Sequence, residues 1–86
     1  MTKQKADTLL ESLEGVVERV TFVNGFFSIN VVRIDKASFK WGQENITVVG
    51  HFGRLSIGKS YYFTGRLQRN RRHGNQFVVT SYRHLD

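Results

Sequence analysis

The chain has 86 residues, a formal net charge of +6 and no cysteine. Its length suffices for one small domain, and without cysteine that domain has neither disulfides nor thiolate metal sites to stabilise it. No apolar run approaches the roughly 20 residues that span a bilayer, and the N-terminus lacks the apolar core of a signal peptide, so we expect a cytoplasmic protein with no membrane partner.

Residues 1–12 are predicted to form a polar tail or a short helix ahead of the folded domain, which is assigned to residues 13–86. Asp7 is a candidate N-cap for a short helix that ends at Leu13. Helices this short are marginal without docking, so we expect the segment to pack against the first strand.

Two runs rich in β-branched and aromatic residues, 15–23 and 26–34, are predicted to be the first two strands. Asn24-Gly25 between them is a strong hairpin signal. A type I′ turn with positive φ at both Asn24 and Gly25 is expected, because this turn matches the twist of the flanking strands.

Alternation divides the second predicted strand into two faces. The apolar face, expected to point into the core, is Phe27, Ile29 and Val31. The opposite face is Phe26, Ser28 and Asn30.

Three further strands are predicted, at 45–52, 59–67 and 76–82. Gly50 inside a strand suggests a bulge or a tight bend. The segment 53–58 is predicted to be a turn in which Leu55 or Ile57 plugs one end of the fold.

Five strands with no long helix indicate an all-β domain, a small Greek-key barrel whose closure removes exposed sheet edges. The OB-fold is the expected architecture, and an SH3-like barrel is the alternative. Only about six residues link the third and fourth strands, so the helix that OB-folds often carry there is expected to be reduced or absent.

Residues 53–60, GRLSIGKS, match the phosphate-binding P-loop pattern. A P-loop requires a helix N-terminus after its glycines, whereas YYFTGRL follows here and alternates as a strand. We therefore interpret the match as a turn between strands.

No catalytic constellation is visible. The three histidines, His51, His73 and His84, lack ligand-like spacing, and the acids form no paired-carboxylate pattern. We therefore expect a non-enzymatic chain with no metal and no cofactor.

The excess positive charge lies entirely in the C-terminal part. Residues 1–50 carry six basic and six acidic residues, whereas residues 51–86 carry seven basic residues and one acid, Asp86. Four arginines belong to the predicted loop between the fourth and fifth strands: Arg66, Arg69, Arg71 and Arg72. An anionic partner, nucleic acid before a membrane surface, is the natural inference, and simple solubility is the alternative.

OB-folds bind single-stranded nucleic acid on the second and third strands, with basic groups along the phosphates and aromatic rings against the bases. The candidate nucleic-acid-binding residues are Arg66, Arg69, Arg71, Arg72, Arg33, Lys40, Phe26 and Trp41. Phe26 and Phe39 also have a structural interpretation, as core residues or barrel-end plugs, which we prefer because few residues fill so small a core.

Three segments together suggest a family: LEGVVERVTFVNGF, ITVVGHFGRLSIGKSYYFTGR and HGNQFVVTSY. Over residues 13–83 they resemble the N-terminal OB-like domain of bacterial RecD-like DNA helicases, the exodeoxyribonuclease V alpha-subunit-like proteins. The chain departs from that family in a shorter loop before Asn24-Gly25 and in Lys59, where the family often has an acid.

The resemblance implies an accessory domain of a 5′-to-3′ DNA helicase, or a small stand-alone relative, because the family's ATPase motor has no counterpart here. Single-stranded DNA is the expected partner. The alternative is a module in DNA repair or recombination whose basic loop docks an acidic protein or the remaining helicase domains.

Overall fold

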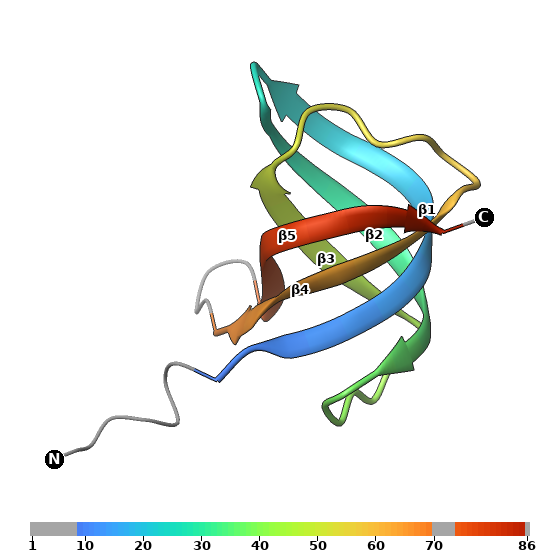
Figure 1. Ribbon diagram of the computed structural model, residues 1–86, viewed down its shortest axis with the longest axis vertical. Helices are drawn as coiled ribbons and strands as arrows, with labels where there is room; N and C mark the ends of the chain where they lie inside the picture. The colour runs from blue at the N-terminus through green and yellow to red at the C-terminus, as the bar shows by residue number, and fades with distance from the viewer. Residues whose placement is uncertain (1–8, 70–73, 86) are drawn as a thin grey trace, which may run out of the picture.

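The computed structural model describes residues 9–69 and 74–85. The strands are β1 (Glu11–Asn24), β2 (Phe27–Ala37), β3 (Asn45–His51), β4 (Ser60–Gln68) and β5 (Gln76–Leu85). They close into a barrel in the order β1-β2-β3-β5-β4, with β4 pairing back onto β1 (Figure 1). β3 and β5 run parallel, whereas the other neighbouring strands are antiparallel. This arrangement confirms the predicted five-stranded OB-fold.

The described residues contain no helix, so none of them belongs to a helix long and apolar enough to cross a membrane. The short link between β3 and β4 is accordingly free of helix, as predicted. The predicted helix ending at Leu13 is wrong in its described part, because β1 begins at Glu11. Leu13 is fully buried opposite Phe63 of β4, and this pairing outweighs the weak helical tendency of a short segment.

The β1–β2 turn differs by one residue from the prediction. Asn24, the last residue of β1, pairs with Phe27, the first residue of β2, so Gly25 and Phe26 form the loop. Gly25 has φ 64°, and no described residue other than glycine has positive φ. Positive φ at the first loop position alone is typical of a type II′ turn rather than the expected type I′.

The two faces of β2 are the reverse of the prediction. Ser28, Asn30 and Val32 are fully buried inside the barrel, whereas Phe27, Ile29 and Val31 alternate with them on the outside and are half-buried. Inside, the Asn30 amide Nδ2 donates to Ser28 Oγ (3.1 Å) and to the Val48 carbonyl oxygen (3.3 Å). These hydrogen bonds offset part of the cost of burying polar groups, which alternation in the sequence does not reveal.

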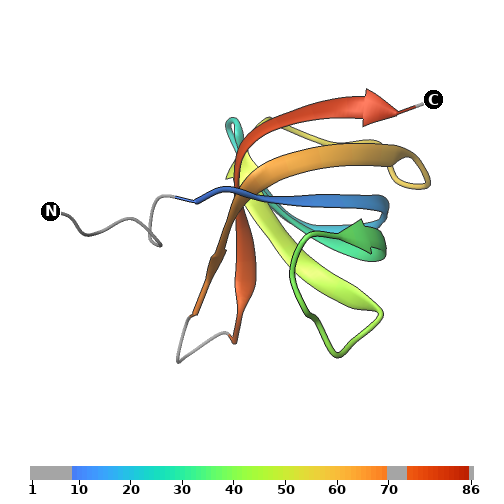
Figure 2. The same ribbon diagram turned by 60° about the horizontal axis from the view of Figure 1, so that its bottom comes forward.

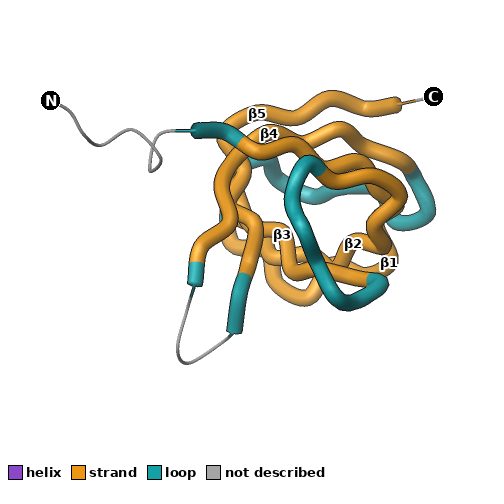
Figure 3. The backbone as a smooth tube through the Cα atoms, turned by 90° about the horizontal axis from the view of Figure 1, so that it is seen from below, coloured by secondary structure: helices purple, strands orange, loops and turns teal. Residues whose placement is uncertain are grey.

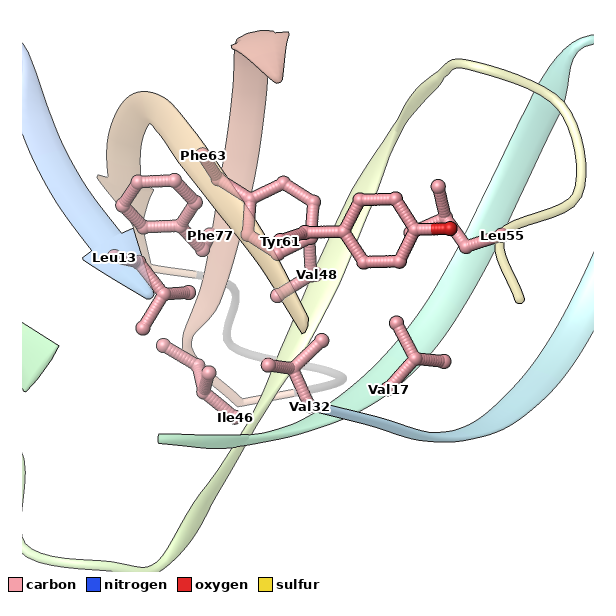
Figure 4. Close-up of a cluster of buried hydrophobic side chains, with 9 residues drawn as sticks. All are labelled: Leu13, Val17, Val32, Ile46, Val48, Leu55, Tyr61, Phe63 and Phe77. Carbon is pink, nitrogen blue, oxygen red and sulfur yellow. The ribbon is translucent and has the colours of Figure 1, made fainter. Parts of the chain in front are cut away.

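The hydrophobic core runs along the barrel axis (Figure 4). It consists of Leu13, Val17, Val32, Ile46, Val48, Leu55, Tyr61, Phe63 and Phe77. Leu55 reaches the core from the β3–β4 connection with 3% of its surface exposed, so it is the predicted plug. Ile57, the other candidate, is exposed.

Three glycines of the strands allow backbone and side chains to approach closely. β2 and β3 pair without interruption through Gly50, so the predicted bulge is absent there. Gly50 instead makes room for the Phe52 ring, which a Cβ would meet. At Gly15 of β1 a Cβ would overlap the Arg33 carbonyl oxygen. At Gly65 of β4 a Cβ would overlap the Val78 carbonyl group, and the pairing register with β5 shifts there.

The connections gather at two ends of the barrel. The β1–β2 end carries the β1–β2 turn and the β3–β4 connection, joined by a hydrogen bond from the Gly53 N–H to the Phe26 carbonyl (2.7 Å). The β2–β3 end carries the β2–β3 connection, which lies over the barrel opening (Figure 3), and the end of β4 with the start of β5, which project together from the barrel (Figure 2). The two ends therefore present different surfaces.

Candidate nucleic-acid interface

A groove of about 590 Å³ lies at the β2–β3 end, and we call it the Trp41 groove. The β2–β3 connection forms one wall with Lys40, Trp41, Gly42 and Gln43, and the β4–β5 hairpin forms the other with Leu67, Gln68, Arg69 and Asn75. The fold thus brings together three predicted binding residues, Lys40, Trp41 and Arg69, that lie far apart in the sequence.

Trp41 is held in place from two sides. Its indole Nε1 donates a hydrogen bond to the Asn45 carbonyl (2.9 Å), and its ring meets Phe39 edge-on at 6.2 Å. Phe39 in turn stacks on the buried ring of Phe77 at 5.6 Å, which confirms the core role preferred for Phe39. A half-exposed tryptophan fixed in this way offers a preorganised ring to a planar ligand.

A second surface is formed by the outward face of β2 and the residues paired with it. This surface continues across the sheet, because directly paired residues of neighbouring strands point to the same side. Phe22 pairs with Ile29, Ile29 with Val49, Val49 with Val78, and Val78 with Arg66. The result is an apolar row on the outward side of the sheet that crosses four strands and ends at an arginine on β4. Val49 in its centre is only 6% exposed, so the row presents mainly its other members to a ligand.

Aromatic rings extend this row toward the β1–β2 end. Phe27 contacts Phe22 edge-on at 6.3 Å and His51 at 5.3 Å. Phe22 has 48% of its surface exposed. We call the whole surface the outer face, defined by Phe22, Phe27, Ile29, Val31, Thr47, Val49, His51 and Val78.

The outer face is continuous with the Trp41 groove. Arg66 and Gln68 alternate on the same side of β4, and Gln68 lines the Trp41 groove. A smaller hollow of about 410 Å³ beside it is lined by Arg66, Leu67, Gln68, Val78 and Thr80. An extended ligand can therefore run from the aromatic rings past Arg66 to Arg69 and Trp41.

The predicted arginines differ in their surroundings. Arg66 and Arg69 are exposed, while Arg71 and Arg72 lie outside the described residues. Arg33 also points outward but lies 3.9 Å from the carboxylate of Asp35. Glu18 is close as well, because it accepts a hydrogen bond from Asn45, the residue paired with Arg33. These acids make Arg33 the weakest of the described cations as a phosphate contact.

Phe26 is neither a core residue nor a barrel-end plug, because 78% of its surface is exposed at the tip of the β1–β2 turn. The turn lies at the opposite end of the barrel from the Trp41 groove. In the structure Phe26 therefore lies apart from Trp41, Lys40 and Arg69, which are also candidate nucleic-acid-binding residues. The outer face lies between the two ends.

The segment 53–60, which matches the P-loop pattern, forms the connection from β3 to the start of β4. β4 begins at Ser60, where a P-loop would begin a helix. Several of its backbone N–H groups are already used: Gly53 donates to the Phe26 carbonyl, Gly58 to the Val17 carbonyl, and Lys59 to the Ser56 carbonyl. The Ser56 N–H donates to the Tyr61 hydroxyl (3.0 Å). Amides that would have to cradle phosphate therefore hold the fold together.

No group of three or more metal-ligating side chains occurs within residues 9–69 and 74–85. The functional candidates that sequence reasoning missed are the outward residues of β1 to β3, above all Phe22, Phe27 and His51. Alternation marks Phe27 as part of one face but does not say which face turns outward. In the structure, the burial of Ser28 and Asn30 identifies the inward face of β2. The sequence contains this polar pair, but the pair identifies a face only when the strand register is known.

Residues 10–85 match the family model for the OB-fold domain of ATP-dependent DNA helicase YrrC. The chain belongs to this family. The match covers all five strands, the outer face and the described walls of the Trp41 groove. No curated protein and no solved structure matches the chain. The DNA-helicase context inferred from the sequence is thus confirmed at the level of the OB-fold domain of an ATP-dependent DNA helicase.

Proposed function

We propose that this YrrC-type OB-fold domain binds single-stranded DNA without sequence preference. It would act as a non-catalytic accessory domain of a RecD-like 5′-to-3′ helicase of the exodeoxyribonuclease V alpha type. The family gives the DNA-helicase context. The observation that carries the binding proposal is the apolar and aromatic row that crosses four strands outside the barrel and ends at Arg66.

The proposed path uses the two ingredients of sequence-tolerant single-strand binding, which are stacking surfaces and cations. Bases would lie against Phe22 and Phe27 on the outer face and against Trp41 in the Trp41 groove. Phosphates would pass Arg66 and Arg69, with Arg71 and Arg72 as further predicted contacts.

The test is fluorescence anisotropy with a labelled oligothymidine of about 15 nucleotides, the upper range of an OB-fold site. We expect affinity to fall steeply with salt. An Arg66→Ala/Arg69→Ala variant should bind at least tenfold more weakly. It should also lose about 1.4 from the slope of log affinity against log salt, since each contact to single-stranded DNA contributes about 0.7.

The matched control is Arg54→Ala/Arg83→Ala, which removes the same charge away from the proposed path. Arg54 lies in the β3–β4 connection, and Arg83 lies over the Tyr62 ring at 4.8 Å. If both double variants weaken binding equally, the attraction is a property of net charge and the assigned path is wrong.

Docking of an acidic protein or of the remaining helicase domains is the second candidate function. Lys40 and Arg69 face the same groove as Trp41, and this combination suits an acidic peptide with an apolar side chain. Titrating an acidic peptide against prebound oligonucleotide separates the two functions. A peptide that displaces DNA at equal or lower concentration would favour the protein partner.

A further inference from the structure

The two halves of β5 have different neighbours. Gln76, Phe77 and Val78 pair with β3 on one side, and β5 from Gln76 to Leu85 pairs with β4 on the other, with the exception of Thr80. After Val78, no described residue of β5 pairs with β3. The first five of these residues, 79–83, form what we call the open edge of β5.

A register shift explains why β5 leaves β3 at this point. Thr64 pairs with Ser81 and Gly65 with Val79, so Thr80 is an extra residue in β5. The Thr80 hydroxyl donates to the Thr64 carbonyl (3.1 Å), which fixes the irregularity. Such a bulge bends its strand, and Figure 1 shows β5 turning sharply before it runs along β4 toward the C-terminus.

The bend opens a hollow between β5 and the end of β3. Its volume is about 450 Å³, and it is lined by His51, Phe52, Val79, Thr80, Ser81 and Tyr82. Tyr82 pairs with Phe63, a core residue, and so faces the inner side of the sheet. It nevertheless has 45% of its surface exposed and contacts Phe52 at 5.2 Å. An inward-facing aromatic ring is therefore uncovered beside an unpaired strand edge.

We propose that the open edge of β5 accepts an extended acidic peptide as an additional strand. Main-chain hydrogen bonds to residues 79–83 would provide affinity, and alternate side chains would provide specificity. On the inner side an apolar side chain would cover Phe52 and Tyr82.

On the outward side of the incoming strand, charge determines which side chains are favoured. Arg83 pairs with Tyr62 and faces outward, and residues 51–85 contain no aspartate or glutamate. A glutamate or aspartate opposite Arg83 would therefore find an opposite charge and no competing acid from this stretch. A second copy of the chain pairing antiparallel over residues 79–83 would instead place Val79 opposite Arg83 and would offer it no opposite charge. The partner is thus an extended segment that alternates apolar and acidic residues.

Thr80 of the open edge also lines the hollow beside Arg66, and His51 of the outer face lines the hollow beside the open edge. The inference nevertheless does not rest on the proposed function, because its test measures peptide binding in the absence of DNA. The experiment uses the full chain and a peptide of about eight residues, a common strand length, that alternates valine and glutamate. We expect the peptide to shift the backbone amide NMR signals of residues 79–83 and to slow their hydrogen exchange. Methylation of alternate peptide nitrogens should abolish binding, since it removes the main-chain donors.

Reversing the charge of residue 83 distinguishes specific strand pairing from nonspecific peptide binding. Arg83→Glu should weaken the valine–glutamate peptide about tenfold and strengthen a valine–lysine peptide by a similar factor. The inference is overturned if the signal shifts lie elsewhere or if the N-methylated peptide binds equally well. It is also overturned if both peptides bind the variant as they bind the parent chain. Dimerisation seen by light scattering with the shifts at 79–83 would assign the edge to a second copy and also contradict it.

Discussion

Between residues 27 and 31 of β2, the inside and the outside carry side chains of opposite character to those of an ordinary half-buried strand. Ser28 and Asn30 lie inside the barrel with no exposed surface, while Phe27, Ile29 and Val31 lie outside. Core packing alone would favour apolar side chains inside, as is the case for Val32. The inversion supports the proposal that the outer face is a binding surface.

The largest difference between inside and outside should appear in stability. Phe63→Ala removes a fully buried ring, so we expect the free energy of unfolding to fall by about 3–5 kcal/mol. Phe22→Ala on the outer face is the matched control and should cost less than about 1 kcal/mol. Urea denaturation of both variants measures the contrast. Equal losses would mean that Phe22 belongs to the core and would remove it from the binding surface.

The outer face should show the reverse pattern in DNA binding. Phe22→Ala is expected to weaken oligothymidine binding by about 1–3 kcal/mol, the usual contribution of one stacked base, while leaving the fold intact. Circular dichroism checks the fold, and anisotropy measures affinity. Ile57→Ala provides a control, because Ile57 is also exposed but belongs to the β3–β4 connection. A comparable loss in this control would mean that general surface hydrophobicity drives binding.

A smaller effect is expected when the buried polar pair is made apolar. Asn30 Oδ1 is buried with no hydrogen-bond partner, and such an atom costs free energy. Ser28→Ala/Asn30→Leu removes both side-chain partners together and takes only the Asn30 donor from the Val48 carbonyl, so stability should stay within about 1 kcal/mol of the parent or increase. Thermal unfolding measures the change. A loss above about 3 kcal/mol would show that the pair is a necessary part of the core.

The smallest effect on stability is expected in the β1–β2 turn. Phe26→Ala should change stability by less than about 0.5 kcal/mol, because the ring is exposed. Gly25→Ala in the same turn should cost about 1 kcal/mol or more, since Gly25 has φ 64°. Chemical denaturation of the pair compares them. If Phe26→Ala proves the more harmful change, Phe26 packs against a neighbour and the exposed tip is misassigned.

The sequence predicted the strands well, because the period of two and the turn residues are local signals. It failed where the answer depends on pairing between distant segments. Whether Ser28 or Phe27 faces inward is decided by the register with β1 and β3, and the start of β1 at Glu11 is decided by its pairing with β4.

The candidate site was predictable in its residue types but not in its geometry. Trp41, Lys40 and Arg69 line one groove, whereas Phe26 is exposed at the other end of the barrel. Binding by Arg66, Arg69, Arg71 and Arg72 stays a prediction.

The parallel pairing of β3 with β5 also constrains how the protein is made. The contact between Val49 and Val78 joins segments far apart in the chain, and nothing local can replace it. During synthesis the barrel cannot close until β5 has left the ribosome, so the first four strands wait as an unclosed sheet with exposed edges. Long-range strand contacts also slow folding in general. We therefore expect nascent chains that end before Gln76 to be protease-sensitive and prone to aggregate, whereas chains that include Leu85 become resistant in one cooperative step.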